Sequence, residues 1–391
     1  MHSLVARTVV GRRYRRAVAG ALIGLSLPAI ACVAVLSTGA RPAAGASVVA
    51  ASGSTSATPK ASSSVAELPP ISAAAAEQIA KAEAALDADD AVKAEALFAK
   101  AAALAPKRAE PRVGQARAIL IGLGVPFELA AARGDAARVK RVGEARKLLD
   151  EAKKLEPTYA EAYLVAGRAA LVLDEGATAL AELDQAVALM PTDPEAISAR
   201  GVAKLALGRG DEAIADLKRA VDLDRTRASR WRNYATALLL RGRPADAVRA
   251  YEEAVKLAPE DAGVHNDLGA ALLQTGDLPR ATRELELAVK LAPKSAVLRV
   301  SVGFAYQSAK RFTEAEAAYK EAIRLEPGRV AAWVNLGTLY AHLGRNDDAK
   351  AALKKALELD PKEPRAKALL DELNAPKPAP APSGSAPPPK P

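Results

Sequence analysis

A proline recurs along the chain from residue 157 onward at a nearly constant spacing. It stands at positions 157, 191, 259, 293, 327 and 361, and each step is 34 residues except for one of 68. The skipped position is Arg225, which follows the same kind of sequence, Val-Asp-Leu-Asp. A fixed period in this range is typical of stacked helical hairpins, in which each repeat packs only against its neighbours. The spacing therefore predicts a solenoid rather than a globular domain with a single core.

Four columns of side chains repeat within this period, and the first three contain only Gly or Ala. The first column is Ala82, Ala116, Gly167, Gly201, Ala235, Gly269, Gly303 and Gly337. The second is Ala94, Ala145, Ala179, Ala213, Ala247, Ala281, Ala315 and Ala349. The third is Ala101, Ala152, Ala186, Ala220, Ala254, Ala288, Ala322 and Ala356. The fourth is bulky and apolar: Phe98, Leu149, Leu183, Leu217, Tyr251, Leu285, Tyr319 and Leu353. Because helices approach closely only where small side chains meet, these columns predict eight tight hairpins.

The last full unit carries the motif of a known family. Its residues Trp333, Leu336, Gly337, Tyr340, Ala349, Leu353, Ala356 and Pro361 fall in order on the motif positions of the tetratricopeptide repeat (TPR). Residues 75–363 resemble this family. The resemblance implies an all-α fold, namely a right-handed α-solenoid of about eight TPR helical hairpins. Residues 365–374 are amphipathic and are expected to form the C-terminal cap helix that an open stack requires.

Composition divides the chain into four parts. Residues 1–46 form a leader, and residues 47–74 form a linker rich in Ala, Ser and Pro that we expect to be disordered. Residues 75–374 form the TPR superhelix, with an insert at about 122–139 in its second unit. The insert contains a segment, Phe127–Arg133, with a helical pattern that either lengthens a helix or adds a loop. Residues 375–391 form a proline-rich tail, expected to be extended.

The leader predicts export or membrane anchoring. Five arginines between Arg7 and Arg16 precede an uncharged run, Ala17–Ala40, which is long enough to cross a bilayer as a helix. Arginines before such a run favour an N-terminus in the cytoplasm. Two forms stay open. The helix is retained and anchors the chain in the inner membrane with the repeats in the periplasm, or a signal peptide is cleaved after Ala46 and the chain is secreted to the periplasm.

The net charge of +9 does not predict nucleic-acid binding, because most of it lies outside the repeats. Residues 1–74 carry seven Lys/Arg and one Asp/Glu, and the tail adds Lys377 and Lys390. Residues 75–374 therefore hold 46 of the 55 basic and 45 of the 46 acidic residues. A phosphate-binding surface needs clustered positive charge, and the repeats mix both signs.

Residues suited to catalysis or metal binding are sparse. The chain has one cysteine, Cys32, and three histidines, His2, His265 and His342. His265 replaces the tryptophan that Trp231 and Trp333 supply in other units, which indicates a packing role. We expect no catalytic residue, no metal site and no cofactor, and therefore no enzyme.

The resemblance implies that the first helix of each hairpin lines a groove that binds peptides. Asn233, Asp267 and Asn335 share one motif position, with Ser301 between them, and side-chain amides can pair with the backbone of an extended peptide. The predicted groove residues are Arg232, Asn233, Thr236, Asn266, Asp267, Gln274, Phe304, Gln307, Asn335 and Thr338.

The function expected from this groove is a non-catalytic scaffold or adaptor of the cell envelope that binds a peptide segment or partner protein. Two alternatives stay open: a regulatory or substrate-recognition subunit of an envelope enzyme complex, and a surface carrier that binds glycans or lipids. Repeats of this family serve many partners, so the sequence does not decide between these functions.

Overall fold

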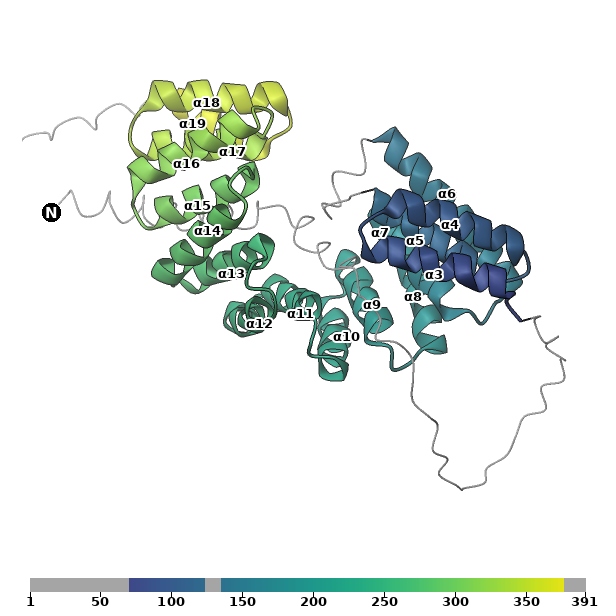
Figure 1. The fold of residues 1–391 in the computed structure, drawn as a ribbon. Helices are drawn as coiled ribbons and strands as arrows, with labels where there is room; N and C mark the ends of the chain where they lie inside the picture. Colours follow the sequence, from purple (N-terminus) through teal and green to yellow (C-terminus); the bar gives the residue numbers. More distant parts are fainter. Residues whose placement is uncertain (1–69, 124–134, 376–391) are drawn as a thin grey trace, which may run out of the picture. The chain divides into compact units, whose positions relative to one another are not determined.

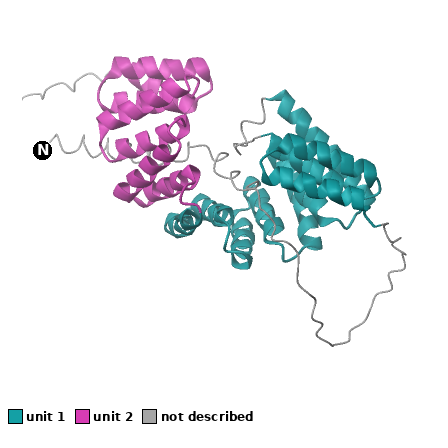
Figure 2. Cartoon of the chain, viewed as in Figure 1, with its two compact units in different colours: residues 1–257 teal, residues 258–391 magenta. Residues whose placement is uncertain are grey.

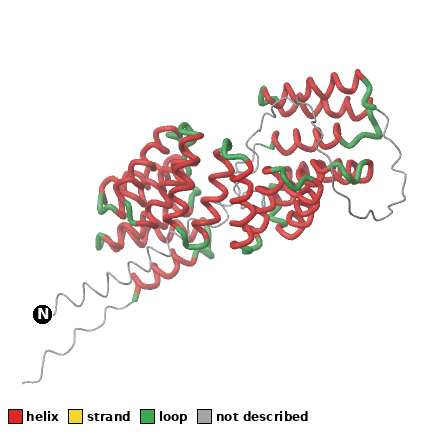
Figure 3. Tube along the Cα trace, turned by 90° about the horizontal axis from the view of Figure 1, so that it is seen from below, coloured by secondary structure: helices red, strands yellow, loops and turns green. Residues whose placement is uncertain are grey.

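The computed structural model describes residues 70–123 and 135–375, and within these ranges the chain forms helices joined by turns and contains no strand (Figure 3). Figure 1 shows the helices in chain order. The first ten are α3 (Ala73–Asp87), α4 (Ala91–Leu104), α5 (Glu110–Gly122), α6 (Ala136–Leu155), α7 (Ala160–Val172), α8 (Gly176–Leu189), α9 (Pro194–Ala206), α10 (Gly210–Leu223), α11 (Ala228–Leu240) and α12 (Pro244–Leu257). The other seven are α13 (Ala262–Thr275), α14 (Leu278–Leu291), α15 (Ala296–Ser308), α16 (Phe312–Leu325), α17 (Val330–His342), α18 (Asn346–Leu359) and α19 (Pro364–Asn374).

The chain divides into two compact units (Figure 2). Unit 1 ends at Leu257 and contains the hairpins from α3–α4 to α11–α12. Unit 2 begins at Ala258 and contains the hairpins α13–α14, α15–α16 and α17–α18, followed by α19. We call the first helix of each hairpin its A helix and the second its B helix. The predicted all-α array of eight hairpins with a C-terminal helix is confirmed.

The four columns of the sequence form the interior of each hairpin. Every residue of the second and third columns is fully buried, and every residue of the bulky column is at most 1% exposed. At the five glycines of the first column, an added Cβ would lie 2.4–2.8 Å from the bulky side chain of the same hairpin. The small residues thus leave the space that the bulky residue fills, as the sequence predicted.

The turns between A and B helices use a left-handed backbone conformation. The glycines there have positive φ angles, between 69° and 85°, at Gly208, Gly242, Gly276 and Gly344. In three hairpins the turn places a residue with a side chain in the same region: Asp89, Asp174 and Lys310, at φ of 59–62°. Glycine adopts this conformation without steric cost, whereas other residues do not.

Replacing Gly344 with alanine should therefore lower the free energy of unfolding by about 1 kcal/mol, because the new Cβ is strained at φ 75° although nothing lies within 4 Å of it. The matched control is Gly328→Ala. Gly328 also has open space around its Cβ position, but its φ lies outside the left-handed region. Chemical denaturation of both variants tests this, and equal midpoints would show that the turn conformation is not needed.

The insert of the second unit is described in part. Helix α6 has 20 residues, against 14 for the other B helices, and its first turn, Ala136–Val139, belongs to the insert. The last residues of the insert therefore form the start of this longer helix. The segment Phe127–Arg133 lies outside the described residues.

At the N-terminal end of the array, Ser72 caps α3 by accepting a hydrogen bond from the Ala75 backbone amide at 3.3 Å, so this helix begins two residues before the expected start at 75. At the C-terminal end, the expected cap helix is α19. The predicted leader, most of the predicted linker and nearly all of the predicted tail lie outside the described residues. Among the helices of residues 70–123 and 135–375, none combines the length and apolar character needed to span a bilayer.

Candidate binding faces

The A helices form one continuous face within each unit. In unit 1, α5 contacts α7, α7 contacts α9 and α9 contacts α11. In unit 2, α13 contacts α15, α15 contacts α17 and α17 contacts α19. We call this surface the A-helix face. The A helices contain all ten groove residues predicted from the sequence, three of them in unit 1 and seven in unit 2.

The polar residues that share one motif position lie where neighbouring A helices meet. Asn233, Asp267, Ser301 and Asn335 are all buried, with at most 9% of each residue exposed. Asn233 Nδ2 donates a hydrogen bond to Ser198 Oγ at 3.3 Å and so joins α11 to α9. These polar residues thus contribute to the packing between successive A helices as well as to the face itself.

Two of the predicted groove residues are hydrogen-bonded inside their own hairpins. Thr236 Oγ1 lies 2.8 Å from the hydroxyl of Tyr251, and the Tyr319 hydroxyl donates to Gln307 Oε1 at 2.9 Å. Both tyrosines belong to the bulky column, which other hairpins mostly fill with leucine. A buried hydroxyl needs a hydrogen-bond partner, and in these two hairpins a polar side chain of the A helix supplies it. This structural role was not predicted for Thr236 and Gln307.

The remaining predicted residues of unit 2 differ in exposure. Asn266 is half-buried, and its Oδ1 atom is fully buried and makes no hydrogen bond. Phe304 is 7% exposed, Thr338 is half-buried and donates to the Val334 carbonyl, and Gln274 is exposed. An unsatisfied buried carbonyl oxygen costs free energy, so the Asn266 amide would gain a hydrogen bond if its side chain turned toward the A-helix face.

The A-helix face of unit 1 differs from that of unit 2 in that ion pairs connect its successive A helices. Arg117 of α5 pairs with Glu83 of α3 and donates to Glu161 of α7 at 2.9 Å. Burial alone would lower the pKa of Arg117, but Glu161 and Glu83 outweigh this effect and raise it. The half-buried Glu110 lies near the same carboxylates, and burial followed by repulsion from Glu161 raises its pKa.

A second set of ion pairs continues across the next A helices of unit 1. Arg168 of α7 pairs with Glu195 of α9, and the buried Arg230 of α11 donates to the same carboxylate at 3.1 Å. The predicted Arg232 is buried two residues further along α11. This ion pairing between repeats was not predicted from the sequence. The available signal was spacing: Arg168 and Glu195 are 27 residues apart, and Arg117 and Glu161 are 44 apart, which is the same offset lengthened by the insert.

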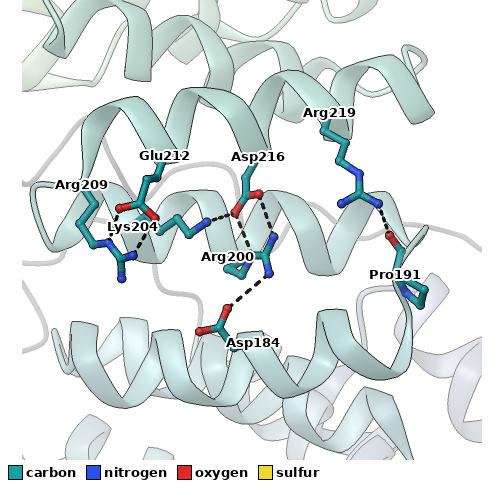
Figure 4. Close-up of polar contacts among 8 residues, drawn as sticks. All are labelled: Asp184, Pro191, Arg200, Lys204, Arg209, Glu212, Asp216 and Arg219. Atoms are coloured by element: carbon teal, nitrogen blue, oxygen red, sulfur yellow. Dashed lines mark hydrogen bonds and ion pairs between the residues drawn. The ribbon is translucent and has the colours of Figure 1, made fainter.

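Between α9 and α10, the buried carboxylate of Asp216 binds two cations (Figure 4). Arg200 donates two hydrogen bonds of 2.8 Å to Asp216 of α10, and Lys204 donates one of 2.7 Å. Arg200 also reaches Asp184 of α8 at 3.3 Å. Burial would raise the pKa of Asp216, but these hydrogen bonds outweigh it and lower the pKa.

His265 packs like the tryptophans it replaces. Its Nε2 atom lies 2.9 Å from the Pro259 carbonyl, and the indole Nε1 groups of Trp231 and Trp333 donate to the carbonyls of Arg225 and Pro327 in the same way. This geometry confirms the packing role. Within residues 70–123 and 135–375, no three His, Cys, Asp or Glu side chains are grouped so that they could hold a metal ion.

Family models match two parts of the chain, both described as the tetratricopeptide repeat. One model matches residues 306–373, and another matches residues 198–262 and 235–296. These matches support the TPR family for most of unit 2 and the end of unit 1. The comparison with curated proteins finds no match.

Solved structures support the fold. The chain is similar to the APC/C hetero-tetramer Cut9–Hcn1, with a TM-score of 0.58 and 16% identity over 76% of this chain. It spans about half of that protein, 55% of its length. Two shorter matches are YrrB, described as a TPR protein with an unusual peptide-binding site, and PilF of Pseudomonas aeruginosa. YrrB has a TM-score of 0.39 and 20% identity over 48% of this chain and 97% of its own. PilF has a TM-score of 0.47 and 19% identity over 55% of this chain and 97% of its own.

Proposed function

We propose that this protein is a non-catalytic scaffold of the cell envelope that binds an extended segment of a partner protein on the A-helix face of unit 2. The observation that carries this proposal is the unsatisfied Oδ1 atom of Asn266, buried on α13. Asn335 on α17, 9% exposed, offers a second amide and makes no side-chain hydrogen bond to the described residues. Both groups suit the alternating N–H and C=O groups of an extended backbone.

The neighbouring apolar surface supports the same occupant. Phe304 lies on α15, between the helices that carry the two amides, and can contact a side chain of the bound segment. Gln274 at the end of α13 and Thr338 on α17 add polar groups to this face. Backbone pairing would bind many sequences, as a scaffold requires, while Phe304 would favour segments with an apolar side chain.

The envelope location rests on the leader. Arginines from Arg7 to Arg16 followed by the uncharged Ala17–Ala40 direct the repeats to the periplasm, anchored to the inner membrane or released after cleavage following Ala46. A chain without residues 1–46 should remain in the cytoplasm. The mass of the mature N-terminus would distinguish anchoring from cleavage.

The binding proposal is tested by crosslinking the full chain in cells and recovering the captured proteins. Asn266→Ala with Asn335→Ala should reduce capture of a specific partner about tenfold, because each amide contributes about one hydrogen bond. The control is Thr313→Ala with Lys354→Ala, two exposed positions on the B helices α16 and α18. Circular dichroism of each variant confirms that it is folded.

Equal capture by the amide variant and the control would overturn binding on this face. Recovery of the chain in a stable complex with a catalytic subunit would favour the regulatory-subunit alternative. Binding of glycans or lipids by the purified chain, with no protein partner, would favour the carrier alternative.

A further inference from the structure

The ring of His265 lies between two oxygen atoms that accept hydrogen bonds. Its Nε2 atom is 2.9 Å from the Pro259 carbonyl, and its Nδ1 atom is 2.7 Å from Glu284 Oε2 on α14. A carbonyl and an ionised carboxylate have no proton to donate, and a neutral imidazole carries only one N–H group. Both contacts together are satisfied by an imidazolium, which has an N–H group on each nitrogen.

This contact is shielded from water. The side chain of His265 is 4% exposed and that of Glu284 is 25% exposed. Apart from the Pro259 carbonyl, no other described residue forms a hydrogen bond or ion pair with either side chain. Without the second proton, the Nδ1 lone pair would face the carboxylate at hydrogen-bond distance with little water between them. A buried polar pair that has lost its hydrogen bond costs free energy.

The other hairpins indicate that this pair is a specific replacement. The position of His265 holds Trp231 and Trp333 in two of them, and each indole makes the same bond to a backbone carbonyl. The residue 19 positions after each tryptophan is an alanine, whereas 19 positions after His265 it is Glu284. A large ring opposite a small residue has thus become a smaller ring opposite a carboxylate. An indole N–H group keeps its proton at all ordinary pH values, so only the histidine hairpin of the three contains a titrating ring.

Carboxylates at the same position of two unit 1 hairpins have partners that stay charged. Glu182 pairs with Lys153 at 2.7 Å, and Asp216 pairs with Arg200 at 2.8 Å. Ammonium and guanidinium groups keep their charge well above neutral pH, whereas an imidazole loses its proton near neutral pH. Glu284 is therefore the carboxylate of this set whose partner can lose its charge.

Within unit 2, Glu284 is the charged group that faces the ring. On α13 and its N-cap, Asp261 and Asp267 accept hydrogen bonds from other groups of the same helix. Helix α15 also contacts α13, and its one charged residue, Arg299, lies near Glu321 of α16. Helix α14 contains four further charged residues, none of which pairs with the ring or its carboxylate: Arg280, Arg283, Glu286 and Lys290.

We propose that His265 and Glu284 form an imidazolium–carboxylate pair that makes the hairpin α13–α14 sensitive to pH. Folding places the ring between two acceptors and so favours the form with two N–H groups. The contribution of the pair to stability is present where the proton is bound, and it is lost as the pH rises and the proton passes to water. Helix α13 also carries Asn266, so, on the function proposed above, the same proton controls binding on the A-helix face.

The proton is located by ¹⁵N NMR of the imidazole nitrogens in the full chain. At about pH 6, both nitrogens of His265 should have the chemical shifts of protonated nitrogens, and one of them should lose its proton as the pH is raised toward about 9. The variant His265→Gln identifies the signals by their absence. A His265 ring with a single N–H group at about pH 6 would overturn the proposal.

The effect on stability is measured by chemical denaturation of the full chain at the same two pH values. Glu284→Gln offers Nδ1 an amide N–H donor, which a neutral ring can accept, so this variant needs no second proton. Between the lower and the higher pH, the unfolding equilibrium constant of the wild type should rise about tenfold relative to that of Glu284→Gln. The matched control is His342→Gln, at the other described histidine, which should keep the wild-type dependence.

A double variant removes the titrating ring altogether. His265→Trp with Glu284→Ala introduces the residues found at Trp333 and Ala352, and it should show the same weak pH dependence as Glu284→Gln. Equal pH dependence of the wild type and Glu284→Gln would contradict the proposal, and so would loss of the dependence in His342→Gln. Both measurements use the chain without a partner, so they test the pair separately from binding on the A-helix face.

Discussion

Replacing Gly303 with leucine should lower the free energy of unfolding by about 3 kcal/mol. Gly303 lies in the A helix α15, and even a Cβ atom there would come within 2.7 Å of the Tyr319 ring. Tyr319 is fully buried, and its hydroxyl is bonded to Gln307, so the ring has no free direction in which to move. Chemical denaturation of the full chain, followed by circular dichroism, measures the effect as a shift of the unfolding midpoint.

Two controls separate helix packing from the effect of leucine itself. Gly328→Leu places the same side chain at a turn position with no atom within 4 Å, and the midpoint should shift little. Combining Gly303→Leu with Tyr319→Ala should cost less than the sum of the two single changes, because the smaller residue makes room for the larger. An unchanged midpoint for Gly303→Leu alone would mean that this residue does not lie at the contact between α15 and α16.

The hairpins could be predicted because their packing depends on side-chain size at fixed positions. The columns that contain Gly303 and Tyr319 repeat every 34 residues, and size alone decides how closely two helices approach. The left-handed turns leave a signal in the sequence only where glycine stands, as at Gly344. They were not predicted at Asp174 and Lys310, because residues with side chains seldom adopt this conformation and so give no local signal.

The division into two units was not predicted. It falls after Lys256-Leu257, within a sequence that resembles Lys290-Leu291-Ala292-Pro293 inside unit 2. Repeats with the same motif can differ in how their neighbouring surfaces contact each other, and the motif contains only the residues that pack within a hairpin.

The candidate site was predicted less completely than the fold. The helical period places Thr236 and Gln307 on the A helix, but it does not show which neighbouring atom takes their hydrogen bonds. Those partners are Tyr251 and Tyr319, and they could be found only by comparing both helices of each hairpin.

Removing the carboxylate of Asp216 is expected to lower the free energy of unfolding of unit 1 by about 3 kcal/mol, because breaking a buried ion pair leaves charges without a partner. In Asp216→Ala, Arg200 and Lys204 lose the group that receives three of their hydrogen bonds. Thermal or chemical denaturation of the full chain measures the loss. Asp216→Asn keeps the shape and removes the charge, so it should cost less than the alanine variant but more than an exposed change such as Lys354→Ala.

The comparison with unit 2 gives this prediction a sharper form. The equivalent positions three repeats later, 102 residues along the chain, hold Val302 and Ala318. Arg200→Val with Asp216→Ala introduces these residues, and it removes the carboxylate together with its main cation. This double variant should therefore be more stable than Asp216→Ala alone, since it does not leave the half-buried Arg200 without its main carboxylate partner. If the double variant were less stable than the single one, Arg200 would contribute mainly by packing, and its loss would outweigh the relief of its charge.

The pH dependence provides an independent check. Because the pKa of Asp216 is lowered in the folded state, its contribution to stability is present above the pKa of an unfolded aspartate, about 4. The contribution disappears as the pH falls through the folded value. The difference in unfolding free energy between the wild type and Asp216→Ala should thus be constant from about pH 6 to 8 and shrink below about pH 4. A difference that persisted in acid would mean that the carboxylate acts through its shape, and the ion pair with Arg200 and Lys204 would not be the source of its effect.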